Sequence, residues 1–259
     1  MSFTLTRGHV PLLISFPHSG THLPASIAST MTDHARTVPD TDWHVPALYA
    51  FARSLGAWTL EAHLSRYVID LNRDPTDTNL YPGQSTTSLC PVDTFEHQPV
   101  YQTGREPTTN DIEQRVTAYW QPYHSTLDNS LNQLKREHGY AVLYDAHSIR
   151  SQVPRFFDGT LSDLNLGTAR GASCGKERRD GAVRLLEQGH WSAVVDQRFV
   201  GGYITRHYGD PANNVHAVQM EIAQSAYMSE DSDRALQPLK ARALSAQLQR
   251  LCEFLLQPR

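Results

Sequence analysis

Two histidines stand where they could hold a metal ion. His18 and His147 each follow a short apolar run of strand length. Imidazoles delivered by neighbouring strand ends are a common start for a zinc site, which also needs a third ligand and an open position. A carboxylate suits the third place, and Asp42 of the segment DTDWH is preferred, with Asp40 as the alternative. The pattern predicts a catalytic metal site.

Other polar residues are suited to an anionic substrate. Asn72 and Arg73 lie in the compact turn sequence DLNRDP, and Arg206 lies in GGYITRHYG, where glycines permit close backbone approach. A guanidinium can bind a carboxylate through two parallel hydrogen bonds. Each arginine is therefore a candidate substrate contact, and a surface or interdomain salt bridge is the alternative for each.

Glu221 interrupts the apolar run VQMEIA. A carboxylate in such a run must be paired, bound to a metal or held for proton transfer, because burying a lone charge is costly. Glu221 is thus a candidate general base, with a buried salt bridge as the alternative.

Local signatures of several other enzyme classes are absent from the sequence. There is no GxGxxG after a strand, no GxxxxGK[ST] and no HExxH, which removes the simplest nucleotide-binding and helix-borne zinc-protease interpretations. Ser148 has no GxSxG elbow, and nothing in the sequence identifies a base for Cys174. Nucleophilic catalysis by either residue is therefore disfavoured.

The elements that must position these residues indicate an α/β sheet, because apolar runs of strand length alternate with amphipathic stretches. Ligands in such sheets bind beyond the carboxyl ends of the strands, so several strand exits should converge on one site. The polar, Gly-rich stretch 159–202 predicts long loops that would cover the sheet as a lid. The predicted buried strands are residues 10–16, 66–71, 140–144 and 215–220.

Helical periodicity predicts two long helices. The first spans residues 110–138, ends at Gly139 and should be kinked or divided at Pro122, since proline removes an intrahelical hydrogen bond. The second spans residues 235–256, with a core-facing stripe of leucines that includes Leu239.

The composition of the chain limits the class of protein it can be and the partners it can bind. With 259 residues, 39% of them hydrophobic, the chain can bury a large core, and residues 1–259 are expected to form a single catalytic domain. The net charge of -4 and dispersed positive residues argue against nucleic acid as a partner. The first apolar run ends too early for a secretion signal or a membrane span. Three scattered cysteines without CxxC favour reduced thiols in a cytoplasm.

Seven segments, in order along nearly the whole chain, resemble the N-formylglutamate deformylases (N-formylglutamate amidohydrolases): FPHSGTHLP, DTDWH, DLNRDP, YDAHSI, VPRFFDGTLSDLNLGT, GGYITRHYG and VQMEIAQSAYM. The resemblance implies a three-layer α/β fold with a central mixed, mostly parallel sheet flanked by helices, related to zinc carboxypeptidases and aspartoacylase-type deacylases. It also implies a hydrolase of bacterial histidine degradation that converts N-formyl-L-glutamate and water to L-glutamate and formate. The expected cofactor is one divalent metal, Zn²⁺.

The resemblance also implies residue roles. Thr21 stands three residues after His18, where the wider relatives carry a glutamate ligand. The carboxylate ligand is therefore expected from the DTDWH segment, with Asp42 as the matching position and Asp40 as the alternative. The implied roles are metal ligands His18, Asp42 and His147, substrate or oxyanion contacts Asn72 and Arg73, carboxylate clamp Arg206, and general base Glu221.

These roles suggest a mechanism. A bound zinc ion would lower the pKa of its water from about 15.7 toward roughly 7. Glu221 would accept the proton of that water, and Arg73 would help to stabilise the negative charge that develops on the substrate oxygen. Two alternatives stay open: hydrolysis of a different acidic N-acyl amino acid, and a non-catalytic protein that binds a small dicarboxylate.

Overall fold

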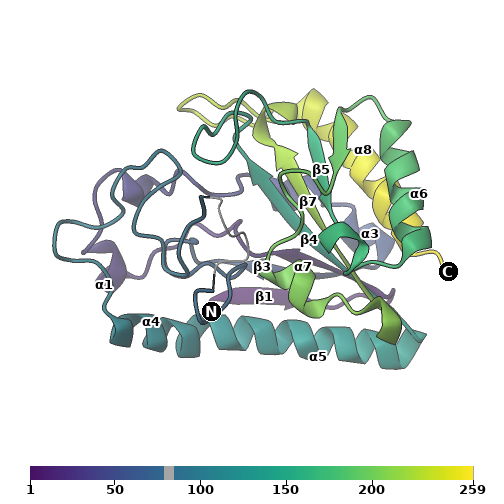
Figure 1. Ribbon diagram of the computed structural model, residues 1–259, viewed down its shortest axis with the longest axis horizontal. Helices are drawn as coiled ribbons and strands as arrows, with labels where there is room; N and C mark the ends of the chain where they lie inside the picture. Colours follow the sequence, from purple (N-terminus) through teal and green to yellow (C-terminus); the bar gives the residue numbers. More distant parts are fainter. Residues whose placement is uncertain (79–84, 259) are drawn as a thin grey trace.

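The structure, a computed structural model, describes residues 1–78 and 85–258 (Figure 1). The described residues form a seven-stranded sheet in the order β1-β3-β2-β4-β7-β5-β6. β1 and β5 run antiparallel to their neighbours β3 and β7, and the other neighbouring strands are parallel. The strands are β1 (Phe3–Thr6), β2 (Leu12–Phe16), β3 (Trp58–Ala62), β4 (Ala141–Ile149), β5 (Leu164–Gly167), β6 (Ala193–Val195) and β7 (Val215–Ala223).

Helices cover both faces of this sheet, as Figure 1 shows. Side chains alternate between the faces along each strand, so Leu12 and Ile14 pack with α2, α6 and α8, while Leu13 packs with α5. The predicted mixed, mostly parallel sheet with helices on either side is therefore confirmed. The α-helices are α1 (Ala25–Ala28), α2 (Val45–Leu48), α3 (Ala52–Leu55), α4 (Thr109–Arg115), α5 (Gln121–His138), α6 (Lys176–Glu187), α7 (Tyr203–Tyr208) and α8 (Pro238–Leu255).

Three of the four predicted strands are present. β4 and β7 extend beyond their predicted ends because they pair along their whole lengths, which places His147 and Glu221 inside the strands and opposite each other. Residues 66–71 are not a strand, and this prediction is wrong. Their apolar side chains pack in the core beside α5, although the backbone is irregular. A run of buried apolar residues therefore looks like a strand in the sequence without being one.

The predicted helix 110–138 is divided into α4, the π-helical turn η2 (Val116–Trp120) and α5. Pro122 lies in the first turn of α5, directly after η2, so the helix is divided next to the residue that lacks an N–H. Gly139 ends α5 with a left-handed φ of 81°. α8 matches the second predicted helix. Leu239 is 83% exposed, however, so its assignment to the core-facing stripe was wrong.

The prediction of long loops over residues 159–202 is also wrong. This stretch contains β5, α6 and β6. α6 is rich in charge, but it buries Ala182 and Leu186 against the core. Gly181 in this helix contributed to the sequence pattern that predicted a loop. A Cβ at this position would lie 2.0 Å from the Phe254 ring, so glycine permits close packing between α6 and α8.

Cys90, Cys174 and Cys252 are free and buried. Among the described residues, no helix has the length and apolar character needed to cross a membrane.

Candidate active site

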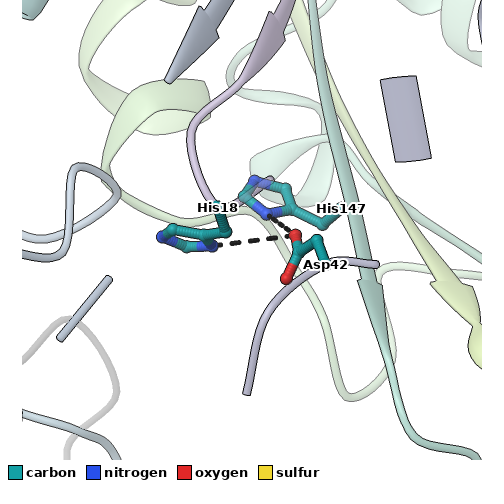
Figure 2. A group of neighbouring side chains, drawn as sticks. All are labelled: His18, Asp42 and His147. Carbon is teal, nitrogen blue, oxygen red and sulfur yellow. Dashed lines mark hydrogen bonds and ion pairs between the residues drawn. The ribbon is translucent and has the colours of Figure 1, made fainter. Parts of the chain in front are cut away.

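Three buried side chains meet near the carboxyl ends of β2 and β4 (Figure 2). His18 follows β2, Asp42 precedes α2 and His147 lies in β4, and one potential ligand atom from each lies within 4.8 Å of the others. Asp42 Oδ2 is 3.1 Å from His147 Nδ1 and 3.8 Å from His18 Nδ1. The structure thus brings together the three residues that the sequence singled out as metal ligands.

Asp42 and Asp40 have different surroundings. The backbone N–H of Asp42 donates to the His18 carbonyl, and its Oδ2 accepts from the Ser148 N–H. Asp40 Oδ2 instead accepts from the Tyr67 hydroxyl at 2.7 Å and lies outside the histidine group. The geometry therefore favours Asp42 over Asp40 as the acid that faces the two histidines.

Two further carboxylates orient the imidazoles. Asp70 Oδ1 is 2.7 Å from His18 Nε2, and Asp145 Oδ2 is 2.8 Å from His147 Nε2. Ionised carboxylates only accept hydrogen bonds, so each Nε2 carries a proton and each Nδ1 faces Asp42. Outer carboxylates that hold the far nitrogen of a histidine are typical of metal sites. Neither aspartate was assigned a role from the sequence. Asp70 lies inside the run 66–71 that was interpreted as a strand, and Asp145 directly follows the predicted strand 140–144.

The charge balance of this region also suits a cation. Four carboxylates, those of Asp42, Asp70, Asp145 and Glu221, are buried, and Asp70 Oδ2 and Asp145 Oδ1 have no hydrogen-bond partner among the described residues. Arg66 is the guanidinium buried with them, and its NH2 contacts His18 Nδ1 and Asp42 Oδ1. Buried carboxylates in excess of buried cations favour binding of a metal ion.

Protonation in the cluster follows from the same charges. Burial lowers the pKa of His147, but Asp145 and Asp42 outweigh burial and hold this pKa well above its usual value. Burial and the Arg66 charge lower the pKa of His18. Because an imidazole binds a metal ion in its neutral form, metal binding and protonation of His147 would compete.

Glu221 faces the cluster from the adjacent strand. It is 7% exposed, and Gln219 Nε2 donates to its Oε2 at 3.4 Å. Burial raises the pKa of Glu221 to about 8, while His147 partly offsets this effect. A carboxyl group with a pKa near neutrality can both accept and return a proton at working pH.

These groups open into a shared cleft. Arg66 and Arg198, both missed by the sequence analysis, line it together with the predicted Arg73. Arg198 lies in the stretch interpreted as loop, and Arg66 begins a run interpreted as a strand, so neither had a distinctive signal. The cleft is also lined by His18, Asn72, His147, Phe156, Phe199, Gly202, Gln219 and Glu221.

Arg206 has a different position from the one expected. It lies on α7, is exposed, and its Nε donates to the Gly201 carbonyl at 2.7 Å. It is not among the described residues that line the cleft. The GGYITRHYG segment contacts residues of the cleft through its backbone instead. The Gly202 N–H donates to Gln219 Oε1, and the Ile204 N–H donates to Asn72 Oδ1.

Known proteins resemble this chain over nearly its full length. It is 49% identical over 252 residues to an N-formylglutamate deformylase of Pseudomonas aeruginosa, covering 96% of this chain and 94% of that one. It is 46% identical over 253 residues to an N-formylglutamate deformylase of Pseudomonas putida, with the same coverage. The crystal structure of N-formylglutamate amidohydrolase from Ralstonia eutropha has the same fold, with a TM-score of 0.82, 24% identity and 98% coverage of both chains. Residues 10–228 match the N-formylglutamate amidohydrolase family, and the chain belongs to that family.

Proposed function

We propose that this protein hydrolyses N-formyl-L-glutamate to L-glutamate and formate, using one bound metal ion. The observation that carries the proposal is a cleft lined by Glu221, three arginines and the two histidines that meet Asp42, His18 and His147. The named relatives support the choice of substrate. In keeping with the family resemblance and the three free cysteines, we place the reaction in cytoplasmic histidine degradation.

His18, Asp42 and His147 would hold the metal, with Zn²⁺ the expected ion because two imidazoles and a carboxylate are a common catalytic zinc set. When bound, such an ion polarises a carbonyl and lowers the pKa of water. Asp70 and Asp145 keep the two imidazoles oriented by holding their Nε2 protons.

Glu221 would carry the proton. Its carboxylate accepts a proton from the attacking water and then donates it to the nitrogen of the leaving L-glutamate. Gln219 orients this carboxylate, since its amide accepts from the Gly202 N–H and donates to Glu221. Arg66, buried against Asp42, would stabilise the negative charge that develops on the formyl oxygen.

Arg73 and Arg198 would bind the two substrate carboxylates. Arg73 donates to the backbone carbonyls of Asn72 and Thr87, which sets the direction of its guanidinium. The Arg198 guanidinium lies over the rings of Phe156 and Phe199, at 5.7 Å and 5.3 Å from their centroids. Guanidiniums held in this way suit bidentate binding of carboxylates.

Asp42→Ala is expected to weaken metal binding by at least about 100-fold, since loss of an outer partner alone costs 10- to 100-fold. Asp40→Ala should leave metal content near that of the parent protein, because Asp40 bonds to Tyr67 and Phe95 instead. Metal analysis of both purified variants tests the assignment. The reverse ranking would move the ligand to Asp40.

Arg198→Ala is expected to lower kcat/KM for N-formyl-L-glutamate by about 10- to 150-fold, through loss of a charge-assisted contact. Arg198→Lys should stay impaired, because an ammonium group cannot form the two-pronged contact. Arg206→Ala is the matched variant. Comparing kcat/KM of the two alanine variants shows which arginine binds the substrate carboxylate. A larger loss in Arg206→Ala would place the carboxylate clamp on α7.

The direct test of function is formate release from N-formyl-L-glutamate by the metal-loaded protein. N-acetyl-L-glutamate and N-formyl-L-leucine, assayed in parallel for L-glutamate and formate release, test the acyl and amino-acid preferences. Binding of L-glutamate without turnover of any of these compounds would favour the dicarboxylate-binding alternative.

A further inference from the structure

Two aromatic side chains of the long helical segment contact the backbone on either side of Asn72. The Trp120 indole Nε1 donates to the Arg73 carbonyl at 3.1 Å. His124 Nε2 is 2.9 Å from the Leu71 carbonyl, and since a carbonyl only accepts, this nitrogen carries the proton. Neither Trp120 nor His124 lines the cleft.

The two rings act as one unit. Trp120 ends the π-helical turn η2, and His124 follows it by one helical turn, so both side chains share a face. Their rings stack at a centroid distance of 3.6 Å with an interplanar angle of 19°. Burial lowers the pKa of His124 to about 3, which keeps it neutral and leaves its Nε2 donor unchanged near neutral pH. π-helical turns often occur beside functional sites.

Asn72 itself is held from two other directions. Its N–H donates to Asp70 Oδ1 at 2.8 Å, and its Oδ1 accepts from the Ile204 N–H at 2.8 Å. A Cβ on Gly202 would lie 2.4 Å from Asn72 Nδ2, so the chain passes tightly against this side chain. The Asn72 side chain and the Arg73 backbone are therefore set by contacts from α5, α7 and the turn.

We propose that Trp120 and His124 are positioning residues that hold the turn of Asn72 and Arg73 in its substrate-binding geometry. The inference rests on the proposed function, because it assigns these two turn residues to substrate. The backbone of this turn is not part of a β-strand ladder. Trp120 of η2 and His124 of α5 supply two of the hydrogen bonds that a ladder would provide.

Trp120→Phe tests the indole donor. The substitution keeps an aromatic ring and removes the N–H, and we expect KM for N-formyl-L-glutamate to rise by about two- to tenfold with a smaller change in kcat. Trp58→Phe is the matched control, because Trp58 is also buried and its indole N–H has no hydrogen-bond partner among the described residues. If both variants raise KM equally, the positioning role is wrong.

His124 variants separate the hydrogen bond from ring stacking. Gln places an amide N–H near the position of Nε2, whereas Phe keeps a ring and removes the donor. We expect His124→Gln to keep KM within about twofold of the parent value, and His124→Phe to raise it by about two- to tenfold. The opposite ranking would show that stacking, and not support of the turn, is what His124 provides.

A readout independent of turnover separates this inference from the proposed function. We expect hydrogen exchange at the amides of Asn72 and Arg73 to be faster in Trp120→Phe than in Trp58→Phe, relative to the global stability of each variant. Absence of formate release by the parent enzyme would contradict the proposed function alone. Equal exchange of the turn amides in the two variants would overturn the positioning role, whatever the activity.

Discussion

Glu221→Gln is expected to lower turnover of N-formyl-L-glutamate by about 100- to 10,000-fold, while bound metal and folding stay close to those of the parent protein. Gln keeps the size and polarity of the side chain but cannot accept the water proton. Glu221 lies opposite His147 in the parallel pair of β4 and β7. Its carboxylate therefore faces the group formed by His18, Asp42 and His147. Turnover, metal content and thermal unfolding of the purified variant are the measurements.

Each alternative role of Glu221 has its own outcome. If Glu221 is a metal ligand, metal is lost together with activity. If it is only a buried ion-pair partner, stability falls most. Glu61→Gln is the matched control, since Glu61 is a carboxylate in a strand of the same sheet that does not line the cleft. Near-normal turnover of Glu221→Gln with metal bound would rule out the proton-transfer role.

The second large effect is expected for His18→Ala and His147→Ala. Each should lose stoichiometric metal and nearly all formate release, because too few protein ligands remain to hold a catalytic ion. The affinity for metal should fall by at least about 100-fold, more than for loss of an outer carboxylate. Metal analysis and the formate assay on the same preparations give the result.

The control for these histidine variants is His216→Ala. His216 is also buried, but its Nδ1 accepts from the Gly175 N–H, away from the cluster. It should keep full metal content, even if its stability falls. Full metal and activity in either His18→Ala or His147→Ala would refute the proposed metal site.

The sequence by itself determined the elements whose signal is local. The apolar runs of β2, β4 and β7 and the 3.6-residue periodicity of α5 and α8 are enough to place these elements, because each pattern repeats within a few residues. The same local reasoning placed His18 and His147 at strand ends, and the structure brings both together with Asp42. Family membership was likewise predictable, since the matching segments are spread over most of the chain.

The local sequence pattern was not sufficient to predict the structure where distant segments of the chain meet. Residues 66–71 have the composition of a strand, yet they are buried as irregular chain, with Asp70 against His18. The charged and Gly-rich sequence of α6 hid a helix, because its glycine is required by Phe254 from another helix.

The choice between similar side chains also depended on tertiary structure. Asp40 and Asp42 are two residues apart, and the hydrogen bonds of Asp42 to the backbone of His18 and Ser148 direct it toward the histidines. Sequence spacing reports which residues share a face of one element, whereas a site is formed where several elements meet. The register of β4 against β7 and the path of the chain between strands decided which carboxylates and arginines face the cleft, because these depend on packing between residues far apart in the sequence.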